Sequence, residues 1–115
     1  MGQLTTHVLD IANGCPGAAI RVELYRCDQS EAIVSMLTNE DGRCETPLLE
    51  GAAFSVGEYE LVFHAGDYFD SMGQKEGQIR FLDQVVIRFG VSNQGQHYHV
   101  PLLLSPFGYS TYRGS

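Results

Sequence analysis

The stretch GEYELVFH, residues 57–64, carries the pattern that decides the fold. In it tyrosine, leucine and phenylalanine occupy every second position. Because successive side chains of a β-strand point to opposite faces, this period of two predicts a strand with one buried face. The same alternation recurs in AAIRVELYR, residues 18–26, and in VVIRF, residues 85–89, so the sequence predicts a fold built from strands.

Turn-forming residues separate these alternating runs. NGCPG at residues 13–17, NEDG at 39–42 and SNQG at 92–95 are rich in Gly and Asn, which tolerate the positive φ angles of tight turns. Strands spaced by such turns, with one short helix near residues 70–76, predict an antiparallel sandwich or barrel. Eight strands are predicted, at residues 4–10, 18–27, 32–37, 43–46, 59–65, 84–89, 97–105 and 109–112.

Composition and charge limit the classes of function. The chain has 115 residues, 43% of them hydrophobic and 18% charged, which suits a single globular domain spanning residues 1–115. Its net charge is -7, so its surface repels phosphate backbones and anionic lipid. We therefore expect neither nucleic acid nor membrane among its partners.

The cysteines indicate the compartment. Cys15, Cys27 and Cys44 are an odd number without CxxC spacing, which argues against a disulfide framework and for a reducing environment. No apolar run approaches the length of a membrane span, and the first residues do not resemble a signal peptide. The sequence therefore predicts a cytoplasmic protein.

Three of the four histidines fall on two predicted strands. His7 shares a strand face with Thr5 and Leu9, and His97 shares a face of a later strand with His99. Taken singly, a strand histidine is usually structural. The His-x-His spacing also occurs at metal sites, but no Asp, Glu or Cys accompanies it here, so neither a metal nor another cofactor is predicted.

Arg43 and the C-terminal tail are the other candidates. Arg43 follows the turn NEDG, where an arginine is ordinarily a solvated charge, although its planar guanidinium also suits a pair of substrate oxygens. Residues 105–115, SPFGYSTYRGS, contain three aromatic side chains, whereas disordered tails are usually polar. We therefore expect the tail to pack against the protein and to place the hydroxyl and carboxylate of Ser115.

Four segments resemble the 5-hydroxyisourate hydrolase family, which is related to transthyretin. They are TTHVLDIANGCPGAAIRVEL at residues 5–24, NEDGR at 39–43, HAGDYFD at 64–70 and HYHVPLLLSPFGYSTYRGS at 97–115. The resemblance covers nearly the whole chain, and its terminal YRGS is specific, because transthyretin lacks both this tetrapeptide and the paired histidines. The chain departs from the family pattern at Phe81-Leu82-Asp83, where an aromatic-proline-glutamate run is common.

The resemblance implies a fold, an assembly and a reaction. The fold is an all-β, transthyretin-like (prealbumin-like) Greek-key sandwich of two four-stranded antiparallel sheets with one short helix. The assembly is a homotetramer, a dimer of dimers, with sites at the dimer–dimer interface. The reaction is hydrolysis of the cyclic amide of 5-hydroxyisourate to 2-oxo-4-hydroxy-4-carboxy-5-ureidoimidazoline in urate degradation, by water that a histidine activates and without a cofactor.

The resemblance also assigns residues. The catalytic group comprises His7, Arg43, His99 and Ser115, with His97 ranked below His99. The substrate-binding group comprises His7, Arg43, His99, Tyr112, Arg113, Gly114 and Ser115.

Three other functions are open on the sequence. A transthyretin-like small-ligand binding protein without catalysis is the first, although it would carry neutral or apolar residues where His7, Arg43 and His99 stand. A metalloenzyme with His7, His97 and His99 as ligands is the second, and it would lose activity on chelation. A purely structural interaction domain is the third, and it leaves the tail unexplained.

Overall fold

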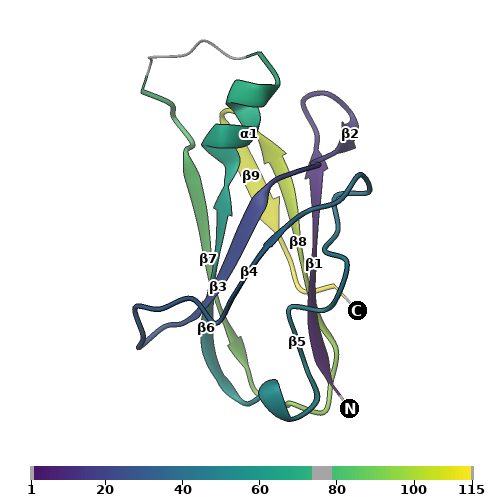
Figure 1. The fold of residues 1–115 in the computed structure, drawn as a ribbon, viewed down its shortest axis with the longest axis vertical. Helices are drawn as coiled ribbons and strands as arrows, with labels where there is room; N and C mark the ends of the chain where they lie inside the picture. Colours follow the sequence, from purple (N-terminus) through teal and green to yellow (C-terminus); the bar gives the residue numbers. More distant parts are fainter. Residues whose placement is uncertain (1, 74–78, 115) are drawn as a thin grey trace.

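Two β-sheets packed face to face make up the fold of the computed structural model, which describes residues 2–73 and 79–114 (Figure 1). The first sheet has the strand order β2-β1-β8-β9, with β5 paired to the other end of β1, and the second has the order β4-β3-β6-β7. The strands are β1 (Gln3–Asp10), β2 (Cys15–Pro16), β3 (Arg21–Arg26), β4 (Val34–Leu37), β5 (Leu49–Glu50), β6 (Gly57–His64), β7 (Gln84–Val91), β8 (Tyr98–Ser105) and β9 (Gly108–Thr111).

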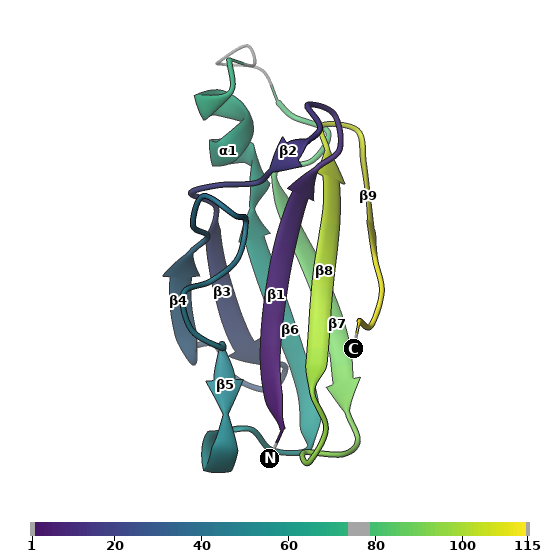
Figure 2. The ribbon, with the colours of Figure 1, turned by 90° about the vertical axis from the view of Figure 1, so that its right-hand side faces the viewer.

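The prediction of an all-β sandwich is confirmed, but two of its details are wrong. The second sheet has four antiparallel strands, as predicted, whereas the first has five, two of them only two residues long. In addition, β1 and β8 run parallel, and Figure 2 shows their arrows pointing the same way. The chain passes through β2 to β7 between these two strands, so no tight hairpin forces them to run antiparallel.

Two predicted elements also differ from the observed ones. Residues 43–46 form no strand, because Arg43 alone pairs there, in a single bridge to His7. The strand predicted at 18–27 begins only at Arg21, since Ala19 has a φ of 58° and so interrupts the extended backbone.

The predicted helix is found, but nearer the N-terminus. Helix α1 spans Ala65–Ser71 and follows β6 directly, so it overlaps the predicted residues 70–76 only at its end. Residues 74–76 of the prediction lie outside the described part of the chain. A 3₁₀ turn, η1 (Gly51–Ala53), follows β5.

The core lies between the sheets and consists of the inward residues of the alternating strands. On β6 these are Tyr59, Leu61 and Phe63, all without exposed surface. They face apolar side chains of β1 and β8, so the period of two in the sequence translates directly into burial. The inward residues of those two strands are Leu4, Val8, Tyr98, Val100, Leu102 and Leu104.

A buried carboxylate fixes the end of β1. Asp10 is almost completely buried and accepts hydrogen bonds from the Tyr68 hydroxyl at 2.6 Å and from the Asn13 amide groups. Burial opposes ionisation of Asp10, but these hydrogen bonds together lower its pKa. The carboxylate thus ties helix α1 to the strand that carries His7.

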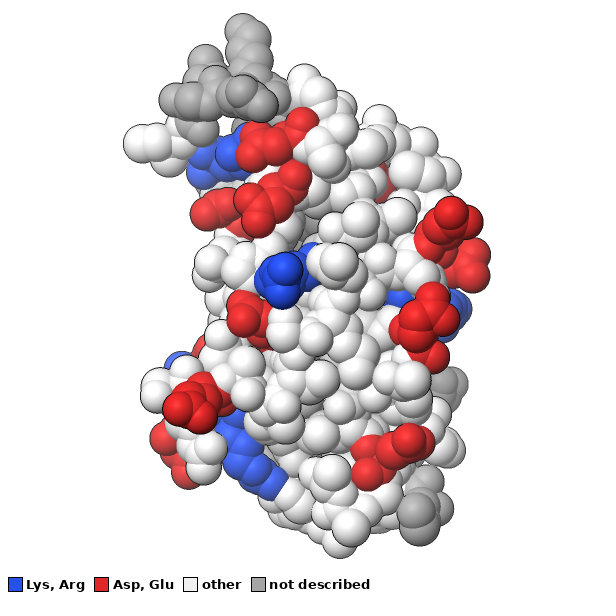
Figure 3. All heavy atoms as spheres, in the orientation of Figure 1, with Lys and Arg blue, Asp and Glu red and all other residues white. Residues whose placement is uncertain are grey.

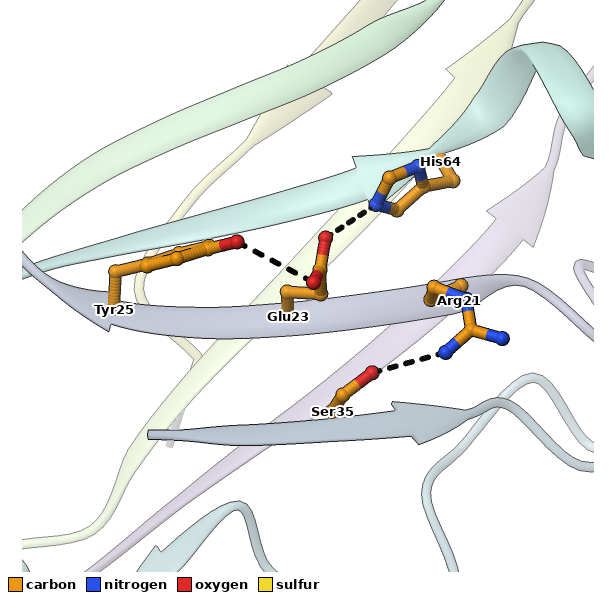
Figure 4. A network of polar contacts seen from close by, with 5 residues as sticks. All are labelled: Arg21, Glu23, Tyr25, Ser35 and His64. Carbon is orange, nitrogen blue, oxygen red and sulfur yellow. Dashed lines mark hydrogen bonds and ion pairs between the residues drawn. The ribbon is translucent and has the colours of Figure 1, made fainter. Parts of the chain in front are cut away.

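The outer face of the second sheet is polar and internally paired. Figure 4 shows Glu23 accepting hydrogen bonds from His64 on β6 and from Tyr25, and Arg21 donating to Ser35. The hydrogen bond from His64 is the main reason that the pKa of Glu23 is lowered. His64 is thus partly buried, and it stands on the opposite sheet from His7 and His99.

Acidic side chains are spread over the molecule. On the face seen in Figure 3 they extend from one end to the other, with only a few basic side chains among them. This face offers no continuous basic stripe to a polyanion. None of the described helices has the length and apolarity needed to cross a bilayer.

Candidate active site

The parallel pairing of β1 with β8 places two histidines on the outer face of the first sheet. In its register Thr5 lies opposite His99, and His7 lies opposite Pro101. The inward neighbours on each strand are buried, so both imidazoles point outward. The ring centroids of His7 and His99 are 6.4 Å apart and the planes are inclined by 30°.

A tight turn brings Arg43 to the same place. The Asn39 side chain accepts hydrogen bonds from the backbone N–H groups of Asp41 and Arg43, and Gly42 adopts a φ of 76°, which favours glycine. The Gly42 carbonyl accepts a 2.8 Å hydrogen bond from the backbone of Val8. The turn is thereby docked onto β1, and Arg43 bridges to His7.

Two hollows meet at His99. One, of about 520 Å³, is lined among others by Thr5, Arg43, Cys44, Glu45 and His99. The other, of about 920 Å³, is lined by His99 and by residues of the tail and of the segment before β8. The residues before β8 are Gly95, Gln96 and His97, and those of the tail are Tyr112, Arg113 and Gly114.

Both histidines are held neutral by their surroundings. Burial lowers the pKa of His7 below its ordinary value, and the positive charge of Arg43 lowers it further. Burial likewise lowers the pKa of His99, with Arg43 and then His7 as the further causes. None of the ion pairs among the described residues involves the Arg43 guanidinium.

The C-terminal tail lies along β8. The backbone N–H of Gly114 donates to the His99 carbonyl at 2.7 Å, which makes an isolated antiparallel bridge. A Cβ on Gly114 would stand 2.9 Å from Cδ2 of His99, so only glycine fits here without a shift. Ser115, which the sequence placed at the site, lies outside the described residues.

Arg113 fastens this tail. Its guanidinium carbon lies 3.9 Å from the ring centroid of Tyr98, and its Nη2 donates to the His97 carbonyl at 2.9 Å and to the Gln96 side chain at 3.2 Å. These contacts give Arg113 a structural task besides the substrate contact that the sequence suggested.

The structure gathers most of the candidate residues. His7, Arg43, His99 and Gly114 come together through adjacent backbone pairings, and Tyr112 lines the second hollow, where its side chain is largely exposed. Across residues 2–73 and 79–114, no three His, Cys, Asp or Glu side chains stand close enough to hold a metal ion.

Sequence reasoning missed several lining residues, among them Thr5, Cys44 and Glu45. Cys44 and Glu45 follow Arg43 directly, so the predicted importance of that arginine could have drawn attention to them. Thr5 shares its strand face with His7, which was visible in the sequence. Its position beside His99 was not, because that depends on the register of two strands at opposite ends of the chain.

Known proteins share both the sequence and the fold. The profile of the HIUase/Transthyretin family matches residues 4–114. A protein of Pseudomonas aeruginosa named 5-hydroxyisourate hydrolase is 58% identical over 117 residues, which cover 100% of this chain and 93% of its own length. The structure of Klebsiella pneumoniae 5-hydroxyisourate hydrolase is 33% identical, with a TM-score of 0.83 and complete coverage of both chains.

A longer protein contains the same fold. The crystal structure of (S)-allantoin synthase is 47% identical, with a TM-score of 0.93 over 99% of this chain. The chain spans only 44% of the length of that protein. Together these likenesses confirm the transthyretin-like fold expected from the sequence.

The close approach of Gly114 to His99 generates a prediction. Gly114→Ala should displace either the tail or the His99 ring, because the added methyl group would stand too close to the imidazole. We expect faster hydrogen exchange of the residue 114 amide and a shift of the His99 ring resonances. Gly108→Ala is the control, since its Cβ would meet nothing nearer than 3.9 Å. Unchanged exchange and resonances in Gly114→Ala would contradict the described contact.

Proposed function

The chain belongs to the HIUase/Transthyretin family, and from this premise and the geometry of its outer sheet face we propose that it hydrolyses 5-hydroxyisourate. The reaction opens a cyclic amide and yields 2-oxo-4-hydroxy-4-carboxy-5-ureidoimidazoline, a step of urate degradation. We take the 115 residues to act as one hydrolase domain.

One observation carries the proposal. Two histidines with lowered pKa values and an arginine that forms no ion pair with any residue of 2–73 or 79–114 lie together on one outer sheet face. Neutral imidazoles accept protons at neutral pH, and a guanidinium binds carbonyl oxygens. This is the pairing of groups that hydrolysis of an amide by water requires.

The chemistry follows from these two kinds of group. One histidine, His7 or His99, takes a proton from a water molecule, whose oxygen attacks the carbonyl carbon of the cyclic amide. The C–O bond forms, and the carbonyl oxygen becomes an oxyanion. The ring C–N bond then breaks, and the departing nitrogen receives the proton from the imidazolium. A well-placed base of this kind contributes about 10²–10⁴ in rate.

Arg43 and the tail complete the proposed site. The Arg43 guanidinium binds the carbonyl oxygens of the substrate and stabilises the oxyanion, and loss of one such donor costs about 3 kcal/mol in comparable sites. Tyr112 and Ser115 orient the ring or the water, while Arg113 and Gly114 hold the tail against β8. No cofactor takes part in this scheme.

The residues at the site argue against the alternative of a carrier without catalysis. A carrier for an apolar ligand needs an apolar channel, whereas this face presents His7, Arg43 and His99. The charge and hydrogen bonding of these groups would be costly to bury against such a ligand.

A homotetramer fits the surfaces that one copy leaves exposed. The strands β7 and β9 are edge strands of the two sheets. Phe81 and Phe107, which precede them and are 72% and 78% exposed, lie with ring centroids 6.3 Å apart and ring planes inclined by 36°. Free edges and exposed aromatic rings favour pairing with a second copy. Two such dimers would then cover the faces that carry His7 and His99 and exclude water from them.

The compartment proposed for this reaction is the cytoplasm. All three cysteines are free thiols in the structure, which suits a reducing environment.

The hydrolysis is tested by an ultraviolet time course on freshly generated 5-hydroxyisourate, with the uncatalysed decay subtracted. The wild-type protein should accelerate the decay, and His7→Ala and His99→Ala should each lose about 10²–10⁴ of that rate while staying folded. His64→Ala is the matched control, because this histidine lies on the other sheet. A variant at His7 or His99 with nearly normal turnover would remove that residue from the mechanism.

The lowered pKa values predict the pH dependence. A base must be unprotonated to accept the proton, so the rate falls as pH drops through the pKa of the acting histidine. Since burial and Arg43 lower both pKa values, the midpoint of the acid limb of kcat/KM should lie below 6.5. The measurement is a pH series with the uncatalysed rate recorded at each point. A midpoint above 6.5 would refute the assignment of these two histidines.

The assembly is tested by sedimentation velocity. The wild-type protein should sediment as a tetramer, and Phe81→Ser together with Phe107→Ser should shift it to smaller species, because the exposed aromatic pair is lost. Ile33→Ser, which removes an exposed apolar side chain at the β3–β4 turn, should leave the tetramer intact. A wild-type monomer at micromolar concentration would show this part of the proposal to be wrong.

A further inference from the structure

One ring nitrogen of His99 has a fixed partner. Nδ1 of His99 and the hydroxyl oxygen of Thr5 are 2.8 Å apart, and both side chains are partly buried. The two residues are 94 positions apart in the sequence, yet they face each other directly in the parallel β1–β8 register. Within the described residues Nε2 of His99 has no hydrogen-bond partner, so it is the nitrogen left for substrate or water.

The partner of Nδ1 matters because a neutral imidazole exists as two tautomers. The nitrogen without the proton accepts hydrogen bonds, and the other donates them, so the group at one nitrogen decides what the other can do. Burial and the positive charge of Arg43 lower the pKa of His99 and so favour the neutral ring, in which the proton can sit on either nitrogen. An imidazole without a partner at Nδ1 would populate both tautomers and rotate about its side-chain bonds.

We propose that Thr5 is a positioning residue for the hydrolysis: its hydroxyl holds Nδ1 of His99, fixes one tautomer and one ring orientation, and so presents Nε2 to the reacting water or substrate. This inference rests on the proposed function. The tail also restrains His99, since Gly114 pairs with its backbone so close to the ring that an added Cβ would stand 2.9 Å from Cδ2. Thr5, on strand β1, and Gly114, in the tail that bridges to the other side of β8, therefore restrain the same residue from two sides.

A hydroxyl is the suitable group for this task. A carboxylate opposite Nδ1 would favour the charged imidazolium and oppose the effect of burial and Arg43. Threonine has no charge and can either donate to Nδ1 or accept from it. It orients the ring without changing its charge.

The test compares Thr5→Val and Thr5→Ser in the full chain. Thr5→Val keeps a branched side chain that suits a strand but removes the hydroxyl, whereas Thr5→Ser keeps the hydroxyl. Thr111→Val is the matched control, because it deletes a hydroxyl that donates to the Pro101 carbonyl of the same strand β8 at 2.7 Å, away from the ring of His99. Circular dichroism and sedimentation establish that each variant is folded and assembled like the wild type.

Nitrogen-15 NMR of the imidazole rings provides the first readout. The wild type, Thr5→Ser and Thr111→Val should show a single His99 tautomer, and Thr5→Val should show a mixture or the opposite one. The identity of the wild-type tautomer also tells whether Nε2 serves as proton acceptor or donor. An unchanged single tautomer in Thr5→Val would overturn the proposal.

Kinetics provide the second readout. Thr5→Val should lower kcat about 10–100-fold, as when the partners that orient metal-bound histidines are removed, and Thr5→Ser should restore most of it. A rise of KM alone, with an unchanged tautomer, would mean that Thr5 contacts substrate instead, and would also overturn the proposal. If the wild type fails to hydrolyse 5-hydroxyisourate, the proposed function falls, whereas the NMR comparison still decides whether Thr5 positions His99.

Discussion

The parallel pairing of β1 with β8 is the constraint on which the site depends. Its seven paired positions run from Leu4 opposite Tyr98 to Asp10 opposite Leu104, and they turn Val8 and Leu102 inward while His7 and His99 turn outward. A slip of one residue would exchange the two faces of a strand, so burial of the core and exposure of the histidines are fixed together. The hydrophobic effect that assembles the sandwich therefore also sets the distance between the two imidazoles.

The two remaining parts of the site attach to the flanks of this pair. Arg43 bridges to β1 at His7, and Gly114 bridges to β8 at His99, each through a single backbone pairing. Neither segment forms a regular strand there, so a local feature must hold each in place: the closed turn at Asn39 for the first, and the clasp of Arg113 on Tyr98 for the second. Backbone pairing therefore sets the order of Arg43, His7, His99 and Gly114 across the sheet, and side-chain contacts hold the two outer segments in place.

The sequence predicted what depends on local patterns. Alternation located β6 within two residues at its start and one at its end, and the turn residues separated the strands. The helix was misplaced because it follows β6 without a break. Its buried residues Ala65, Tyr68 and Phe69 come directly after the alternating residues of the strand, so the change from a period of two to a helical period could not be located in the sequence. The site could be assigned only through the resemblance to a family. His7, Arg43 and His99 belong to three separate segments, and no periodicity in one chain reveals which strands lie side by side.

Tyr98 shows why the tail can be ordered at all. A chain end gains few contacts to offset the entropy lost on ordering. Tyr98 offers the tail a rigid surface, because its ring packs edge-on against Phe54 in the core, with centroids 5.8 Å apart, and its hydroxyl accepts a hydrogen bond from the Ser92 backbone. The Arg113 guanidinium lies over this fixed ring, with its central carbon 3.9 Å from the ring centroid. Tyr98 and His99 are adjacent on β8, so their side chains point to opposite faces of the strand. Tyr98 holds the tail through Arg113, and the tail in turn restrains His99. The core thus determines where the last residues of the chain meet the imidazole.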